Sequence, residues 1–428
     1  MTYSLGEVIE TLFGADLPFE IRAYDGSRAG RVGSPYVVTL RNQRAVRYLA
    51  TAPGEMGFAR AYVMGDLDVE GIDKGDPYDF LKGVLGDFSG TLKVRRPTAA
   101  QLREIVKAVG PGAFNPPPIP SVESAPTWRR MLEGLRHSRR RDADAIQHHY
   151  DVGNEFYELV LGPSMTYTCA AYPSADATLE EAQAHKYDLV CRKLGLQPGM
   201  RLLDVGSGWG GMVRHAVQHY GVTALGVTLS REQATWAQER IKTERLDDRA
   251  EVRHLDYRDV TETDFDAISS IGLTEHIGVK NYPAYFQFLY AKVRPGGRML
   301  NHCITRPDTT SPALERAGFI NRYVFPDGEL TGVGKIVEVM QNTGFEIRHV
   351  EDLREHYART TRAWAQNLSA NWDECVRLAG EPIAKVWGLY LTGSSLGFER
   401  NNIQLHQVLG QKLDDQGVAD YPLRPDFG

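Results

Sequence analysis

The sequence predicts an α/β protein in which a parallel sheet carries helical insertions and follows a small, separate α+β domain. From about residue 200 onward, apolar strand-like segments alternate regularly with helical patterns. A stretch rich in Gly and Pro, residues 110–120, separates this region from the first 110 residues. The length of 428 residues suggests two or three domains, and the 42% hydrophobic content is enough to give each a core.

The first 110 residues show both helical and strand patterns. Leu5, Val8, Ile9, Leu12 and Phe13 recur at helical spacing, and residues 36–40 form an apolar strand-like run. We therefore expect a domain over 1–110, a linker with a basic helix over 111–144, and a larger domain over 145–428.

The segment 128–141 is amphipathic and strongly basic. Trp128, Met131, Leu132 and Leu135 fall on one helical face, and six arginines lie elsewhere. This pattern is typical of a helix on an anionic membrane surface. It fits slightly better an ordinary helix packed between domains whose arginines are solvated, because most amphipathic helices simply pack.

The region from about residue 200 onward, in which strand and helix patterns alternate, is expected to form the sheet. A late helix over 333–342 and a strand over 345–350 extend it, and residues 305–332 and the tail beyond 357 are expected to be insertions that cap or line a pocket. Strands alternating with helices imply right-handed crossovers and parallel strands. The expected strands are 201–205, 223–229, 251–256, 265–272 and 298–304, and the expected helices between them are 212–220, 231–244 and 282–293.

A glycine-rich turn follows the first of these strands and opens the first helix. Gly206, Gly208 and Gly211 fit the dinucleotide spacing G-x-G-x-x-G. A dinucleotide site also needs an acidic residue at the end of the next strand, but that strand ends at Ser230. Asp204, inside the glycine turn itself, suits a cationic cofactor with an amino-acid tail. The sequence thus favours S-adenosylmethionine (SAM) over NAD, and a Rossmann-like methyltransferase sheet.

Two further strand ends carry polar residues that could do chemistry. Glu275 and His276 follow the fourth strand, and His302 lies at the end of the fifth. Catalytic groups in open α/β sheets gather at the carboxyl ends of strands. Taken singly, Glu275 could instead be a helix-start residue and His302 a hydrogen-bonded core residue.

Composition excludes several other classes of protein. The net charge of −6 argues against general nucleic-acid binding. The four cysteines show neither C-x-x-C pairs nor metal spacing, which indicates a reduced, cytosolic protein without a metal site. The N-terminus lacks a signal-peptide pattern, and no apolar run is long enough to span a membrane.

Read together, the motifs resemble the cyclopropane-fatty-acyl-phospholipid synthase family, which includes the mycolic acid cyclopropane synthases. The resemblance covers roughly residues 145–412, and the first 110 residues are similar to the N-terminal domain of the phospholipid-acting members. The motifs that carry it are His149 to Tyr157, Met165 to Tyr172, Asp204 to Gly210, Gly226 to Ser230, Asp256 to Asp259, Glu275-His276, His302 to Thr305 and His356 to Ala358.

The resemblance implies SAM-dependent methylation of a cis double bond in a phospholipid acyl chain, with bicarbonate as a bound base. By matching motifs, the bicarbonate ligands are expected to be Cys169, Glu275, His302, the backbone N–H of Ile304 and the hydroxyl of Tyr357. The expected SAM site comprises Tyr167, Thr168, Asp204, Gly206, Gly208, Gly210, Thr228, Leu229, Ser230, Gln233, Asp256, Tyr257 and Arg258.

Two products are possible, because the cation formed by methylation can close to a cyclopropane or shift a hydride and become a methylene branch. The segments 325–334 and 397–402 resemble the actinobacterial branch that makes 10-methylene-stearoyl lipids, precursors of tuberculostearic acid. That branch implies a separate flavin- or NADPH-dependent reductase as partner. A homo-oligomer attached peripherally to the inner face of the plasma membrane is also expected.

The physics of the reaction adds an expectation about the pocket. A carbocation needs an apolar, aromatic-lined site, for which Tyr290, Phe319, Tyr323 and Phe325 are the candidates.

Two rival functions remain open: a lipid-binding protein on an inactive methyltransferase fold, and a methyltransferase acting on nitrogen or oxygen of a small molecule.

Overall fold

The structure, a computed structural model, describes residues 3–427 except 53, 85–94, 96, 124–151 and 314–317. Contacts divide the chain into two compact units. Unit 1 contains residues 1–125, 317–324 and 365–396, and unit 2 contains 126–316, 325–364 and 397–428. The amphipathic segment 128–141 lies outside the described residues, as do His149, Tyr150 and Asp151. The division at residues 110 and 144 expected from the sequence stays a prediction.

Unit 2 is built on a seven-stranded sheet of order β10-β11-β9-β8-β5-β6-β7. From β7 to β9 all neighbours are parallel, and β11 runs antiparallel to both β9 and β10. The predicted α/β fold is therefore confirmed. The strands are β5 (Arg201–Val205), β6 (Thr223–Thr228), β7 (Ala250–His254), β8 (Phe265–Ile271), β9 (Val293–Thr305), β10 (Glu346–Asp352) and β11 (Gln404–Gln411).

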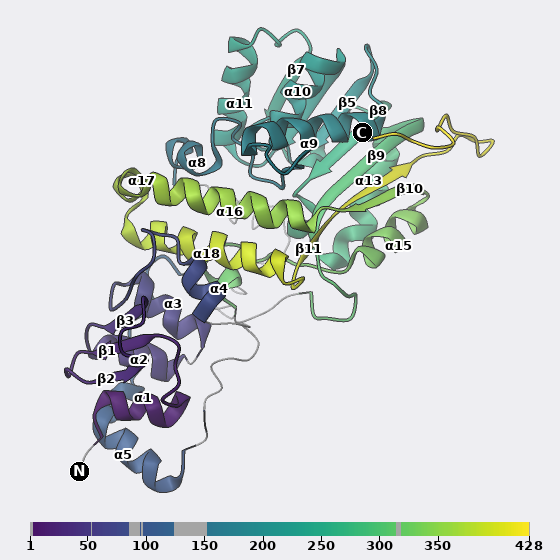
Figure 1. Cartoon of the computed structure of the whole chain (residues 1–428). Helices are drawn as coiled ribbons and strands as arrows, with labels where there is room; N and C mark the ends of the chain where they lie inside the picture. The colour runs from purple at the N-terminus through teal and green to yellow at the C-terminus, as the bar shows by residue number, and fades with distance from the viewer. Residues whose placement is uncertain are drawn as a thin grey trace. The chain divides into compact units, whose positions relative to one another are not determined.

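Helices cover both faces of this sheet (Figure 1). Leu202 packs into the hydrophobic cluster on one face and its neighbour Leu203 into the cluster on the other, so β5 is buried on both sides. Helices α9 (Leu179–Leu194), α10 (Gly211–Tyr220) and α11 (Arg231–Thr243) contribute to the first cluster, and α13 (Tyr282–Lys292) and α15 (Val333–Thr343) to the second.

The expectation that the tail beyond 357 consists only of insertions is wrong. Residues 404–411 form β11, which lies inside the sheet between β9 and β10. Its residues Leu405 and Val408 are buried, but two polar residues separate them, so the sequence lacks the strict alternation that predicts a strand. Before β11 the tail forms α16 (Arg354–Ala370), α17 (Trp372–Ala379) and α18 (Glu381–Glu399), and residues 365–396 of these helices belong to unit 1. Residues 412–427 form neither helix nor strand.

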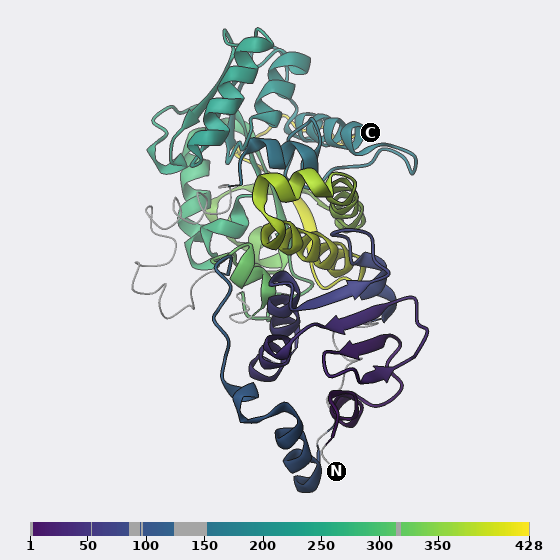
Figure 2. The same cartoon turned by 90° about the vertical axis from the view of Figure 1, so that its left-hand side faces the viewer.

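Unit 1 contains a four-stranded sheet of order β2-β1-β3-β4, whose purple strands lie side by side in Figure 2. The predicted helix and strand are present as α1 and β3. The strands are β1 (Glu20–Ala23), β2 (Arg28–Gly30), β3 (Val37–Leu40) and β4 (Leu67–Glu70); the helices are α1 (Leu5–Phe13), α2 (Gln43–Thr51), α3 (Glu55–Val63), α4 (Tyr78–Val84), α5 (Ala99–Val109), the 3-10 helix η1 (Pro111–Phe114) and α14 (Phe319–Tyr323).

The described part of the expected linker packs onto unit 1. The Tyr48 hydroxyl donates to the carbonyl of Pro118 (2.7 Å), and Arg47 Nε donates to the carbonyl of Asn115 (2.9 Å). The segment then ends on Glu123, whose side chain is fully buried. Residues 111–123 therefore belong to the packed surface of this unit.

Glu123 is the centre of a buried charge cluster. Arg60 donates to both of its carboxylate oxygens at 2.7 Å, Arg322 donates at 2.9 Å from Nε, and Tyr323 donates at 3.1 Å. Burial raises the pKa of Glu123, but the hydrogen bonds from the two arginines outweigh burial and leave the pKa lowered. The cluster thus ties residues 111–123 and α14 to α3.

We expect Glu123→Gln to destabilise unit 1 by about 3 kcal/mol, because it leaves two buried guanidinium groups without a countercharge. Urea unfolding and hydrogen exchange of residues 111–123 would measure the loss. Glu70→Gln is the matched control, since the Glu70 side chain is 58% exposed. Equal stability of the two variants would contradict the assigned role of the cluster.

Candidate functional site

The glycine turn between β5 and α10 forms one side of the site. The N–H groups of Gly206 and Ser207 both donate to the carbonyl of Val227 at 2.9 Å, which fixes the turn to the end of β6. Gly206, Gly208 and Gly210 have φ values of 79°, 53° and 74°, a region that favours glycine. The local sequence therefore permits a turn that other residues would strain.

The glycines of this turn serve different purposes. A Cβ on Gly210 would lie 3.1 Å from Ala237 Cβ, and one on Gly211 would lie 2.2 Å from Tyr187 Oη, so both allow close helix packing. A Cβ on Gly208 would meet nothing closer than Gln233 Nε2 at 4.0 Å. Gly208 therefore borders open space, where a cofactor could approach the backbone.

Asp204 lies in β5, beneath the turn rather than within it. It is 2% exposed, and its Oδ1 accepts a hydrogen bond from Ser269 Oγ of β8 at 2.6 Å. Burial raises the pKa of Asp204 to about 6. The carboxyl group thus links two strands under the loop, and its expected contact with a cofactor's amino-acid tail stays a prediction.

The end of β6 holds the next group of expected cofactor residues. Thr228 Oγ1 donates to Gln233 Oε1 (2.9 Å), and Ser230 Oγ accepts from the Gln233 N–H (3.2 Å), which caps α11. The carbonyl of Leu229, between them, lies 3.1 Å from His254 Nε2. These bonds hold the loop beside the glycine turn.

The loop after β7 is ordered in a similar way. Asp256 caps the 3-10 helix η3 (Tyr257–Asp259) and pairs with Arg258, the closest N–O distance being 2.5 Å. The ring of Tyr257 stands edge-on to Tyr285, with 5.2 Å between centroids. The three residues thus share a rigid loop at the carboxyl edge of the sheet.

Glu275 lies in the short helix α12 (Thr274–Ile277), directly after β8. It is 8% exposed, and its Oε1 accepts a hydrogen bond from the backbone N–H of Ile304 at 2.7 Å. Its Oε2 is buried and has no hydrogen-bond partner among the described residues. Burial raises the pKa of Glu275 to about 7. The Ile304 N–H here holds Glu275, and its expected role as a direct anion ligand stays a prediction.

His302 lies at the end of β9, two residues before Ile304, whose N–H holds this carboxyl group. It is 1% exposed, and its Nδ1 lies 3.1 Å from Gln407 Nε2. Its Nε2 is buried and also lacks a partner in the described part of the chain. Burial lowers the pKa of His302 well below its usual value, and the charges of Lys186 and Lys193 lower it further. The imidazole is therefore neutral.

Cys169 and Tyr357 join the same region through Leu353. The Cys169 thiol donates to the Ala170 carbonyl at 3.1 Å and lies 3.8 Å from the Leu353 carbonyl. The N–H of Tyr357 donates to that same carbonyl (3.1 Å). The N–H of Leu353 donates to Leu405, the cross-strand partner of Ile304. These contacts connect Cys169 and the backbone of Tyr357 through β11 to strand β9, which carries His302 and holds Glu275 at Ile304.

A buried lysine was missed by the sequence reading. Lys186, on α9, is fully buried and donates to Thr168 Oγ1 at 2.9 Å. Its ammonium nitrogen lies 3.7 Å from the centre of the Tyr187 ring. Burial lowers its pKa to about 7. Lys186 positions Thr168, one of the expected cofactor residues; a single lysine on an amphipathic helix gave no signal of this role.

An aromatic wall connects the glycine turn with the anion site. Ring centroids of successive members lie 4.5 to 6.1 Å apart, and the wall includes Tyr167, an expected cofactor residue. The sequence reading did not find this wall, because its members come from separate segments. In order they are Trp209, Tyr157, Tyr167, Trp364, Tyr357 and Phe398.

Four aromatic residues were expected from the sequence to line the acyl pocket, and the structure places them in different parts of the chain. Tyr290 packs edge-on to Phe345 near the start of β9, at the opposite end of the strand from His302, so this expectation is wrong. Phe319 and Tyr323 belong to unit 1 and stack on each other. Phe325 packs against His276 in unit 2.

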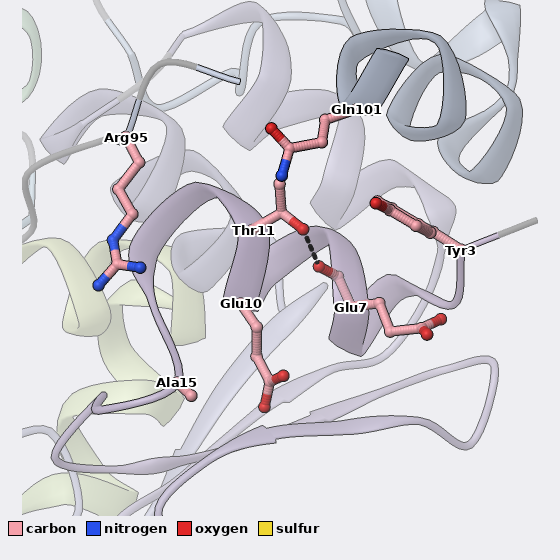
Figure 3. Close-up of a pocket in the computed structure, with 7 residues that line it drawn as sticks. All are labelled: Tyr3, Glu7, Glu10, Thr11, Ala15, Arg95 and Gln101. Atoms are coloured by element: carbon pink, nitrogen blue, oxygen red, sulfur yellow. Dashed lines mark hydrogen bonds between the residues drawn. The ribbon is translucent and has the colours of Figure 1, made fainter. Parts of the chain in front are cut away.

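A surface groove of about 520 Å³ in unit 1 contains none of the expected site residues (Figure 3). It lies beside α1 and α5, and Glu7 and Arg95 in its lining are exposed. Its lining is largely polar and offers no apolar enclosure for a cofactor. The lining residues are Tyr3, Glu7, Glu10, Thr11, Ala15, Arg95 and Gln101.

The pair of unpartnered atoms fits a small oxyanion. A neutral imidazole can donate from Nε2, and a carboxylate Oε2 can accept. Bicarbonate carries one O–H donor and further oxygen acceptors, so its groups match what each of the two buried atoms lacks. Within the described residues, no cluster of three His, Cys, Asp or Glu side chains could hold a metal ion. The described helices are also too short or too polar to cross a bilayer.

Comparison with known proteins identifies the family. The family described as mycolic acid cyclopropane synthetase matches residues 137–408. The probable fatty acid methyltransferase Rv3720 of Mycobacterium tuberculosis is 54% identical over 423 residues, 99% of this chain and 98% of that protein. The cyclopropane-fatty-acyl-phospholipid synthase of Escherichia coli K12 is 36% identical over 281 residues, 66% of this chain and 71% of that protein.

A solved structure gives the same assignment. Mycolic acid cyclopropane synthase CmaA1, complexed with SAH and CTAB, superposes with a TM-score of 0.59 at 36% identity, covering 63% of this chain and 98% of that one. The chain therefore belongs to the mycolic acid cyclopropane synthetase family and is a SAM-dependent methyltransferase.

Proposed function

We propose that this enzyme methylates the cis double bond of oleoyl-type acyl chains in phospholipids and forms a 10-methylene branch. The observation that carries the proposal is the buried pair Glu275 Oε2 and His302 Nε2, both unpartnered within the described residues and linked through Leu353 to the aromatic wall. A methyltransferase acting on nitrogen or oxygen has no need of such an anion site.

The chemistry of an alkene explains the aromatic wall. SAM, when bound, supplies an electrophilic methyl group. The alkene is a weak nucleophile, so the protein must hold the double bond against that methyl group in a reactive geometry. Methylation leaves a positive charge on the acyl chain, and the faces of Tyr167, Trp364 and Tyr357 can stabilise it in a site from which water is excluded.

The final step needs a base close to the added methyl group. Bicarbonate, when bound, supplies a compact base for the departing proton. His302 donates a hydrogen bond from Nε2, and Glu275 accepts one at Oε2. Hydrogen bonds fix both side chains, Glu275 to the Ile304 N–H and His302 to the Gln407 amide, so the two residues together orient the anion.

The product assignment rests on segments 325–334 and 397–402, which resemble the methylene-forming branch. The relatives named as cyclopropane synthases support the alternative product. A methylene product needs a separate reductase for saturation. We further propose a homo-oligomer at the inner face of the plasma membrane, held there by the basic segment 128–141.

Gly208→Ala tests the cofactor position. The added Cβ contacts no protein atom within 4 Å, so the fold should survive while SAM affinity falls at least about tenfold, or about 1.4 kcal/mol. Gly199→Ala is the matched control, since Gly199 also has positive φ (85°) and open space around it. Calorimetric titration with SAM gives both affinities. Equal affinity in the two variants would contradict the placement.

Glu275→Gln should reduce turnover roughly 100-fold or more, because the anion loses its acceptor. The same change should stabilise the fold above pH 7. Burial raises the folded-state pKa from 4.5 to about 7, so the parent loses stability as pH rises through this range, up to about 3 kcal/mol. Gln does not ionise and avoids this loss.

Thermal melts at pH 4 and pH 8, with activity assays in bicarbonate-depleted and bicarbonate-supplemented buffer, measure both effects. Glu346→Gln, at an exposed position on β10, is the control. A Glu275→Gln variant that keeps full activity, or that is less stable than the parent at pH 8, would exclude Glu275 from the anion site.

The product is tested with purified enzyme, SAM and oleoyl phospholipid. A 10-methylene chain and a cyclopropane chain have the same mass, so proton NMR must separate them. We expect vinylidene signals in the alkene region. Upfield ring protons without vinylidene signals would show a cyclopropane synthase, and methylated soluble amines without lipid product would reject the proposed substrate class.

A further inference from the structure

His302 has a buried partner on the strand that the sequence reading missed. Gln407 of β11 is the direct cross-strand neighbour of His302 on β9, and both side chains are almost fully buried. Gln407 Nε2 lies 3.1 Å from His302 Nδ1, while Gln407 Oε1 accepts a hydrogen bond of 2.6 Å from Lys193 Nζ. One amide group therefore connects a buried lysine with the histidine of the anion site.

The orientation of this amide follows from the lysine. An ammonium group only donates hydrogen bonds, so the Gln407 oxygen must face Lys193 and the Gln407 NH2 must face His302. Lys193 is held in turn by an ion pair with Glu351 of β10. The NH2 group only donates, so His302 Nδ1 must be the acceptor and carry no proton.

The protonation state of His302 is then fully specified. A neutral imidazole carries one proton, and with Nδ1 acting as acceptor that proton must be on Nε2. Burial and the charges of Lys186 and Lys193 keep the pKa of His302 low, which prevents a second proton from binding. Nε2 is the ring nitrogen that has no partner within the described residues.

We propose that Lys193 and Gln407 are positioning residues that hold His302 as the Nε2–H tautomer, and that His302 acts in catalysis as a hydrogen-bond donor rather than as a base. This inference rests on the proposed anion site. Nε2 already holds its proton, and Nδ1 faces an amide N–H, so neither nitrogen can accept the proton that leaves the substrate. The proton must go to the bound anion.

Two substitutions of Gln407 separate this role from a purely structural one. Gln407→Glu keeps a hydrogen-bond acceptor for Lys193 but presents a carboxylate to Nδ1, which forces the proton onto Nδ1 and makes Nε2 an acceptor. Gln407→Met removes both contacts and leaves the tautomer unbiased. We expect Gln407→Glu to be the worse variant, with kcat reduced roughly 10- to 100-fold, the range seen when partners that orient ligand histidines are lost. A structural role predicts the opposite order.

Ring-15N NMR of histidine-labelled protein reads the tautomer directly, without the need for activity. His302→Gln identifies the His302 signals among those of the 12 histidines. We expect protonated Nε2 and unprotonated Nδ1 in the parent, and the reverse in Gln407→Glu. Gln411→Glu is the matched control: it alters a buried glutamine of the same strand, which donates to the Gly296 carbonyl at 3.0 Å and does not touch His302.

The activity arm measures methyl transfer to oleoyl phospholipid at a series of bicarbonate concentrations. In Gln407→Glu we expect a raised bicarbonate requirement together with the lower kcat, and in Gln411→Glu neither. The proposal is overturned if the parent carries its proton on Nδ1, or if Gln407→Glu reverses the tautomer and keeps its kcat within twofold. If the parent shows no bicarbonate dependence, the proposed anion site fails, whereas the NMR result still decides the tautomer.

Discussion

Unit 2 buries two ionisable side chains, Glu275 and His302, at the carboxyl ends of neighbouring strands β8 and β9. Each leaves a polar atom unpartnered among the described residues, and a buried unsatisfied polar atom costs on the order of 1 to 3 kcal/mol. The sheet offsets this cost by burying β5 and its neighbours on both faces. In the proposed function, a bound anion would satisfy both atoms and so offset this cost.

The antiparallel strand β11 gives this site its rigidity. Because it lies between β9 and β10, it places Gln407 directly across from His302, although 105 residues separate them in the chain. A loop residue could not hold an imidazole in one tautomer, since its backbone would move relative to β9. Cross-strand pairing fixes both backbones, and Lys193 on α9 fixes the amide from the other side. The Gln407 side chain thus connects the order of the strands with the proposed tautomer of His302.

Local patterns in the sequence predict much of this fold. The five parallel strands, the helices between them and the glycine turn are visible because each depends on neighbours within a few residues. The place of β11 is not visible, because insertion between β9 and β10 depends on pairing with distant segments. The aromatic wall and the Gln407 contact fail to appear for the same reason. Tyr290 was misassigned because aromatic character does not reveal which end of the sheet a side chain occupies.

The charge balance of the site follows from these contacts. His302 is neutral, and the pKa of Glu275 near 7 means that its carboxyl group is only partly ionised at neutral pH. Lys186 and Lys193 lie on the same helix, α9, and burial lowers the pKa of both, to about 7 for Lys186. An oxyanion bound at His302 and Glu275 would then carry most of the negative charge close to the acyl chain. A cation that forms on that chain is stabilised best where this charge lies, at the point where the proton must leave. In the proposed mechanism the same anion would stabilise the cation and accept its proton, so a neutral donor at His302 would suffice without a second base.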